Sequence, residues 1–209
     1  MNQVLETQEQ VIRVAIDLFS TKGFSGTSIR AIAKGMGMSI SNIYNYFVNK
    51  EGLMLAILQQ SSKILLDTLH QVSDREMDSL NRFKLLVETH LRFSETYRKE
   101  SKIFLIEEGH LSPEGNEINR QIKREILNLY VRELRILKEL GYLGGKDLSV
   151  AAFNVIGVIT WYLRWYRPDG RLSWDEVCKE IVSFVMHGLL GSSPQTQASI
   201  APVKSVEEK

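Results

Sequence analysis

A short polar stretch near the N-terminus carries side chains suited to contacting DNA. Serine and asparagine hydrogen-bond to base edges in the major groove, and a tyrosine hydroxyl can donate to a phosphate oxygen. Ile40, within the same stretch, could contact the methyl group of a thymine. The polar members are Ser39, Ser41, Asn42, Tyr44, Asn45 and Tyr46. We therefore expect residues 39–46 to present a DNA-binding surface.

A phosphate seat is predicted just before this stretch. Ser28 can cap a helix that carries Arg30, and a helix N-terminus favours an anion because its amides point outward. Lys50 would add a full positive charge beside that seat. Arg30 and Lys34 are equally well explained as solvated residues on one helix face, so a DNA contact by Arg30 stays one of two alternatives.

The spacing of apolar residues places these groups on short helices. A first helix ends at Lys22-Gly23, and the glycines at positions 35 and 37 make a tight turn between a second and a third helix. The third helix is predicted over Ile40–Phe47 with Ser39 as its cap, and Asn49 caps a fourth that runs toward His70. This is the layout of a helix-turn-helix, in which the later helix enters the major groove.

Two of the large side chains in this segment are expected to pack inside it. Ile43 and Phe47 are assigned to the core of the small domain. Tyr44 and Tyr46 are assigned to phosphate contact, with core packing as the alternative, because a purely apolar side chain would serve a core equally well.

Overall charge does not supply the attraction for DNA. The chain has 26 Lys and Arg against 25 Asp and Glu, a net charge of +1. Residues 1–55 carry five basic and four acidic side chains. One such domain should bind DNA weakly, so two copies are required, and we expect a homodimer on double-stranded DNA.

Longer helices follow, and no strand pattern is found, so the fold class is all-α. We predict an N-terminal helix-turn-helix domain at residues 1–52, a ligand-binding and dimerisation domain at 53–191, and a disordered tail at 192–209. The helices expected in the second domain are Met77–Arg98, Lys102–His110, Ser112–Leu140, Asp147–Arg167 and Trp174–Gly191.

The last two helices are predicted to form the dimer interface. Both carry more apolar residues than one buried face needs, and small residues such as Ala151 and Gly157 allow close helix approach. A plain intramolecular core is the alternative.

Residues 8–55, and above all the unbroken run from Thr27 to Leu53, resemble the DNA-binding domain of the TetR family of repressors. The resemblance implies a two-domain helical protein that dimerises through its last two helices and represses until a small molecule binds the C-terminal domain. Ile40 departs mildly from the family, which often has a small or polar residue at this position.

The segment from Trp161 to Gly170, with Asn154 before it, resembles TetR-family members that sense acyl-CoA thioesters. An acyl chain needs an apolar tunnel, and CoA phosphates need arginine or lysine at its entrance. Trp161 and Trp165 are thus candidates for the pocket wall, and Arg164 and Arg167 for the phosphate end. Two alternatives stay open: the tryptophans anchor the dimer interface, or the effector is a hydrophobic drug that needs neither arginine.

Other classes of function find little support. The histidines lack metal-clamp spacing, and no nucleophile elbow or paired carboxylates occur, so we expect no cofactor, no metal and no enzyme. A small helical enzyme or an interaction module that has lost DNA binding remains the alternative. Cys178 alone cannot form an internal disulfide, and the Val150–Leu163 run is too short for a membrane span. We expect a cytoplasmic protein with no membrane partner.

Overall fold

The computed structural model describes residues 2–106 and 111–190, and all regular elements in these two ranges are α-helices. The all-α prediction is confirmed. The end of the predicted Lys102–His110 helix and the predicted tail lie outside the described residues. The helices are α1 (Asn2–Lys22), α2 (Ile29–Met36), α3 (Ile40–Tyr44), α4 (Lys50–Ser73), α5 (Ser79–Thr96), α6 (Arg98–Ile106), α7 (Pro113–Glu139), α8 (Leu148–Trp165) and α9 (Trp174–Leu190).

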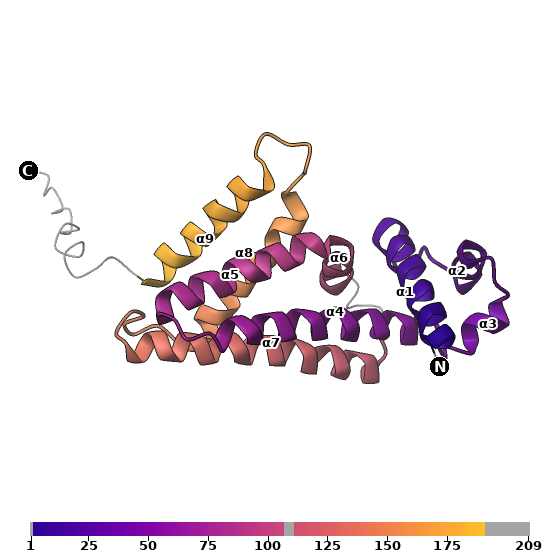
Figure 1. The fold of residues 1–209 in the computed structure, drawn as a ribbon, viewed down its shortest axis with the longest axis horizontal. Coiled ribbons are helices and arrows are strands. Elements are labelled where there is room, and N and C mark those ends of the chain that lie inside the picture. The colour runs from indigo at the N-terminus through magenta and orange to yellow at the C-terminus, as the bar shows by residue number, and fades with distance from the viewer. Residues whose placement is uncertain (1, 107–110, 191–209) are drawn as a thin grey trace, which may run out of the picture.

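Helices α1–α3 gather at one end of the molecule, and α5–α9 form a separate bundle with most of α4 (Figure 1). Helix α4 begins in the small group and runs alongside α7 into the bundle. A single continuous helix therefore joins the two parts, so a tilt of α4 in the bundle moves α1–α3 as well.

Each part has its own apolar core. The core of the small domain is built from α1–α4 around Phe19, Ile32 and Leu53, and it includes Ile43 and Phe47, as predicted. Ile103 from α6 and Leu111, just before α7, belong to this same cluster. Elements of the larger domain thus complete the core of the small one.

Side-chain caps begin most of the helices where the sequence indicated. Ser28, Ser39, Asn49 and Ser112 each accept a hydrogen bond from a first-turn amide, of α2, α3, α4 and α7 in turn. Ser173 and Glu176 form the predicted capping box before α9. These local signals fixed the helix starts to within a few residues.

Helix α8 lies within the predicted Asp147–Arg167 range, is slightly shorter than predicted, and is strongly apolar. By length and composition it is the one helix in the described ranges that could cross a membrane, with a mean hydropathy of 1.3 over 18 residues. A core helix passes the same test, and α8 packs on α5, α7 and α9. Its high hydropathy is explained by apolar residues on two faces, one inside the bundle and one outside.

Candidate DNA-binding site and ligand cavity

The turn between α2 and α3 has the helix-turn-helix geometry. Gly37 ends α2 in the left-handed conformation with a φ of +65°, which a side chain would strain. Helix α3 ends at Tyr44, so the predicted extension to Phe47 is wrong. The amides of Asn45 and Tyr46 bond to carbonyls three residues back, which tightens the last turn before the chain extends toward the α4 cap.

Most of the predicted DNA-reading side chains face outward. Ile40 and Tyr46 are half-buried, and Tyr46 packs against the core of the small domain. Tyr44, by contrast, is 51% exposed although its side chain is aromatic. The exposed members of the stretch are Ser39, Ser41, Asn42, Tyr44 and Asn45. This polar face is what the DNA-contact prediction requires, and the contacts themselves remain a prediction.

The expected phosphate seat has a defined geometry at the start of α2. Ser28 is exposed, and its Oγ accepts from the amide of Ala31 at 3.1 Å. The amides that precede Ala31 lie in the first helical turn, where backbone donors have no partner within the helix. Arg30 is exposed one residue into α2. The exposed Ser28, Arg30 and first-turn amides of α2 suit the predicted phosphate contact, next to α3.

Lys50, predicted to add a positive charge beside the phosphate seat, also makes contacts within the protein. Its Nζ donates to the carbonyls of Phe24 and Thr27 at 2.8 and 2.9 Å, and it lies 4.1 Å from the centre of the Phe24 ring. An ammonium has three donors, and two of them are used here. Lys50 therefore clamps the α1–α2 turn, which fixes the position of Ser28 and of the α2 N-terminus.

Three contacts connect the DNA-binding end to the ligand domain. Lys99 on α6 pairs with Asp17 on α1 at 2.5 Å. The carboxylate of Glu51, in the first turn of α4, accepts from the amide of Ser112 at 2.6 Å. Glu51 also lies close against Gly115, where an added Cβ would collide with it. The starts of α6 and α7 thus lie directly on the small domain.

A cavity of about 220 Å³ lies inside the larger domain. Its wall is formed by α4, α5, α6, α7 and α8, and it is mostly apolar. The half-buried side chains of Glu100 and Lys123 also border it, and burial lowers the pKa of Lys123. The apolar lining residues are Leu65, Phe93, Phe104, Leu105, Ile126, Leu127, Phe153, Ile156 and Leu163; the other polar ones are Ser61, Ser62, His90, Ser94, Ser101 and Thr160. This cavity is suited to an apolar molecule with a polar group.

The four residues predicted to hold the ligand lie elsewhere. The described residues that line the cavity include none of the four, which are Trp161, Arg164, Trp165 and Arg167. Trp161 and Trp165 are 62% and 52% exposed, and the guanidinium of Arg164 lies 5.9 Å from the Trp161 ring centre. The cavity residues come from five helices with no shared local motif, so spacing along the sequence gave no signal for them.

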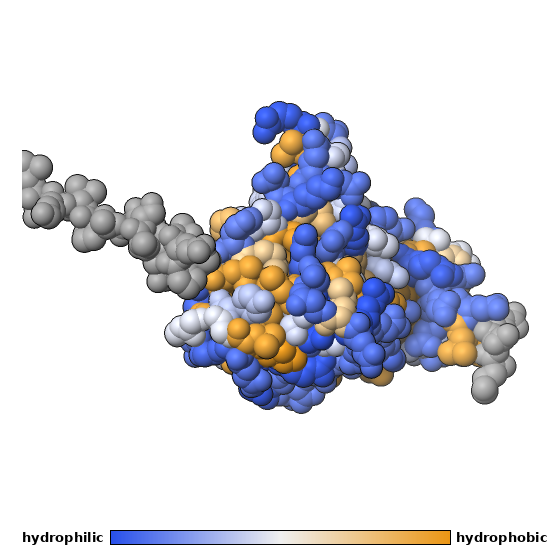
Figure 2. Space-filling model, turned by 60° about the vertical axis from the view of Figure 1, so that its left-hand side comes forward, coloured by the Kyte–Doolittle hydropathy of each residue, from blue (hydrophilic) through white to orange (hydrophobic). Residues whose placement is uncertain are grey.

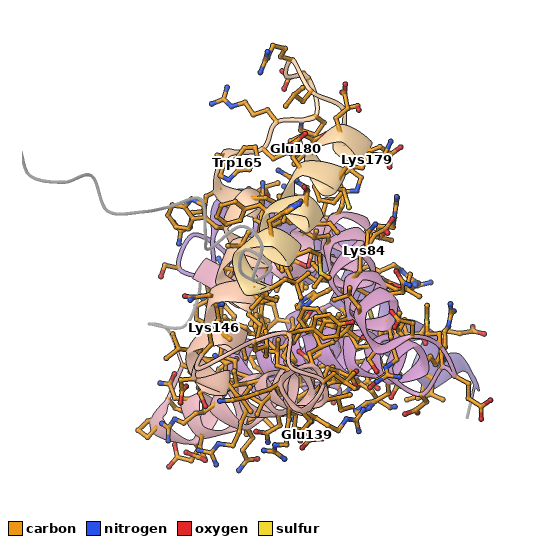
Figure 3. The ribbon with its side chains drawn as sticks, turned by 90° about the vertical axis from the view of Figure 1, so that its left-hand side faces the viewer. Lys84, Glu139, Lys146, Trp165, Lys179 and Glu180 are labelled. Atoms are coloured by element: carbon orange, nitrogen blue, oxygen red, sulfur yellow. The ribbon has the colours of Figure 1, made fainter. Side chains whose placement is uncertain are left out.

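The outer face of α8 and α9 exposes a group of large apolar side chains. Val150, Trp161, Trp165 and Phe184 are each more than half exposed. Figure 2 shows apolar side chains gathered on this side of the molecule, and Figure 3 places Trp165 and Lys146 toward the same side, away from Lys84 and Lys179. Exposed aromatic patches of this kind mark interfaces.

Many apolar residues of the two helices are nevertheless buried within the subunit, and Ala151, Val155 and Val185 among them also line the groove between α8 and α9 on this face. Ala151, Ala152, Val155 and Ile159 of α8 are buried in the protein's own core. The same holds for Val177, Ile181, Val185 and Leu189 of α9. On each helix the exposed residues lie one or two positions along the chain from these buried ones. Their exposed glycines are Gly157 and Gly188.

His90 is buried at the cavity and makes folding sensitive to acid. Burial lowers its pKa from 6.5 to about 4. Between these values the unfolded chain binds a proton that the folded chain excludes, so stability falls as the pH drops from about 6.5 toward about 4. The total loss from this group is about 3 kcal/mol.

Urea unfolding at about pH 7 and about pH 4.5 checks this prediction. The double variant His90→Phe/Tyr130→Phe should lose clearly less stability than the wild type over the same interval. An equal loss in both proteins would show that His90 is not the responsible group.

Comparison with known proteins agrees with this geometry. Residues 11–57 match the model of bacterial regulatory proteins of the tetR family, and residues 76–189 match the tetracyclin repressor-like C-terminal domain. The HTH-type transcriptional repressor KstR2 of Rhodococcus jostii is 28% identical over 186 residues, which are 86% of this chain and 89% of KstR2.

Solved structures show the same architecture. A TetR/AcrR-family transcriptional regulator from Thermobifida fusca is 31% identical with a TM-score of 0.72, covering 88% of this chain and 98% of that one. AibR, solved with isovaleryl coenzyme A and operator DNA, has a TM-score of 0.78 at 23% identity, over 85% and 96% of the two chains. This second likeness shows the fold alone.

Together, the exposed polar α3 and the bundle behind it define a helix-turn-helix DNA-binding protein. The chain belongs to the tetR family of bacterial regulatory proteins. It is a DNA-binding transcriptional repressor of this family and not an enzyme.

Proposed function

We propose that this repressor binds a pseudo-palindromic operator as a homodimer and that an acyl-CoA thioester releases it. The observation that carries the effector half is the apolar cavity, whose wall includes the same two helices that contact the DNA-binding end. Regulators with related folds support the choice of ligand class, since AibR was solved with isovaleryl coenzyme A.

The cavity suits the acyl part of such a ligand. Most of its wall is apolar, which favours a hydrocarbon chain, and ligand sites of this kind add a few polar groups for orientation. Lys123, half-buried at the cavity with its Nζ 5.2 Å from the Phe104 ring centre, supplies a cation for the anionic part. Lys123 thus takes over the role first assigned to Arg164 and Arg167.

Coupling to DNA runs through the starts of α6 and α7. Phe104 and Leu105 of α6 line the cavity, while Lys99 of the same helix holds Asp17 of α1. A ligand that fits better when α6 and α7 spread apart would shift both recognition helices. The dimer then leaves the spacing of about 34–36 Å, or somewhat more, that successive major grooves require. Such a ligand acts only through its different affinity for the two states.

The effector proposal is tested by fluorescence polarisation on labelled DNA from the region upstream of the gene. Acyl-CoAs of graded chain length should weaken operator binding by about 5- to 150-fold, a coupling of about 1–3 kcal/mol. Free CoA, which lacks the acyl chain, is the ligand control. Lys123→Glu should lower the response to thioesters without changing operator affinity when no ligand is present.

A multidrug sensor is the competing function within the same family. Neutral or cationic hydrophobic compounds would not need a cation at the cavity, so Lys123→Glu should leave their effect unchanged or strengthen it. If such compounds release the protein from its operator and no thioester does, the multidrug function replaces the acyl-CoA proposal.

A further inference from the structure

Three buried polar residues border the mostly apolar cavity, and not every polar atom on them has a protein partner. Ser62, His90 and Ser94 are 5%, 3% and 3% exposed, and all three line the cavity. Within residues 2–106 and 111–190, the two side-chain atoms sealed from solvent without a partner are Asn119 Oδ1 and Tyr162 Oη. The polar atoms of Ser62, His90 and Ser94 are not among these sealed atoms. They therefore retain contact with the cavity space that the three residues line.

The partner of His90 fixes which of its ring nitrogens carries the proton. Nδ1 lies 2.9 Å from the hydroxyl of Tyr130, a fully buried residue. No other acceptor for that hydroxyl is found in the described part of the chain, and a buried O–H needs one. Tyr130 therefore donates to Nδ1. The neutral imidazole then carries its proton on Nε2, so Nε2–H is a donor.

We infer that Nε2–H of His90, with the hydroxyls of Ser62 and Ser94, forms a site that recognises a carbonyl oxygen within the cavity. His90 and Ser94 are one turn apart on α5, and Ser62 comes from the neighbouring α4. Three donors beside an apolar wall suit a carbonyl attached to a hydrocarbon chain. The inference deepens the proposed function, because an acyl thioester has this group.

The site should discriminate between ligands that differ in one oxygen. An S-alkyl-CoA thioether matches an acyl-CoA thioester of equal chain length except that it lacks the carbonyl oxygen. When the thioether binds, the buried donors stay unpaired. The wild type is expected to bind octanoyl-CoA at least about tenfold more tightly than S-octyl-CoA in calorimetric titrations.

A second ligand pair separates this inference from the acyl-CoA proposal. 2-Octanone and octane differ in the same oxygen and carry no CoA, and their binding can be compared through the thermal shift of the protein. If no thioester binds but the ketone stabilises the protein more than the alkane does, the acyl-CoA proposal fails and carbonyl recognition stands.

The variants are chosen so that the fold survives. His90→Phe/Tyr130→Phe removes both partners of the buried hydrogen bond and leaves no orphaned hydroxyl. It should show a clearly reduced preference within each pair, because the His90 donor is lost while the hydroxyls of Ser62 and Ser94 remain. Ser94→Ala should reduce the preference partly, and His70→Ala, at an exposed histidine of α4, should keep it in full. Equal or absent binding of both members of both pairs by the wild type, or an unchanged preference in the double variant, would overturn the inference.

Discussion

Replacement of Tyr44 by alanine is expected to weaken operator binding at least about 100-fold. Tyr44 is half-exposed on the outer face of α3, where its hydroxyl can donate to a phosphate. A hydrogen bond to a charged group contributes about 1.5–3 kcal/mol, and a dimer loses two of them. The loss should be similar on specific and random DNA, because phosphates carry no sequence information. Fluorescence polarisation on both DNAs measures it.

Tyr142→Ala is the matched control. Tyr142 is also an exposed tyrosine, 39% accessible, but it lies in the turn after α7, within the larger domain. Its removal should leave DNA affinity unchanged. Equal affinities for the wild type and Tyr44→Ala would remove α3 from the DNA interface.

Phe184→Glu is expected to convert the protein to a monomer. Phe184 is 68% exposed on the apolar outer face of α9, and a symmetric interface would bury the substituted residue twice. Each copy would place an unpaired carboxylate against apolar side chains such as Trp161, at a cost of several kcal/mol. Sedimentation should show the monomer, and operator affinity should fall at least about 100-fold, because one domain alone carries little net charge.

Lys179→Glu controls for the added negative charge. Lys179 is on the same helix but on the other side of it, and Figure 3 shows it apart from Trp165. This variant should remain dimeric at the same concentration. A dimeric Phe184→Glu protein would place the subunit interface on another surface.

The DNA-binding end could be predicted almost completely from the sequence. The starts of α2, α3 and α4 depend on local signals, a serine or asparagine whose side chain accepts from the amide three residues further on. The position of Ile43 in the core follows from its spacing on a single helix. The contacts that Lys50 makes within the protein could not be predicted, because its partners, the carbonyls of Phe24 and Thr27, are more than twenty residues away in the sequence. A backbone acceptor has no sequence signature.

The ligand cavity could not be predicted in the same way. Its polar groups come from separate helices, and Ser62, His90 and Lys123 become neighbours of one space only after α4, α5 and α7 pack. The aromatic segment around Trp165 was predicted to line the pocket because its aromatic and basic residues are contiguous in the sequence. Its apolar character is nevertheless explained by the structure, since α8 has one face inside the bundle and another outside.

The central claim is that two copies of the exposed face of α3 lie in successive major grooves. Methylation interference at guanine N7, a major-groove atom, tests this claim most directly on the upstream DNA. We expect two clusters of interfering guanines on one side of the duplex, one helical turn or slightly more apart, and we expect Tyr44→Ala to weaken binding without moving them. A single cluster, or interference confined to no defined guanines, would contradict it.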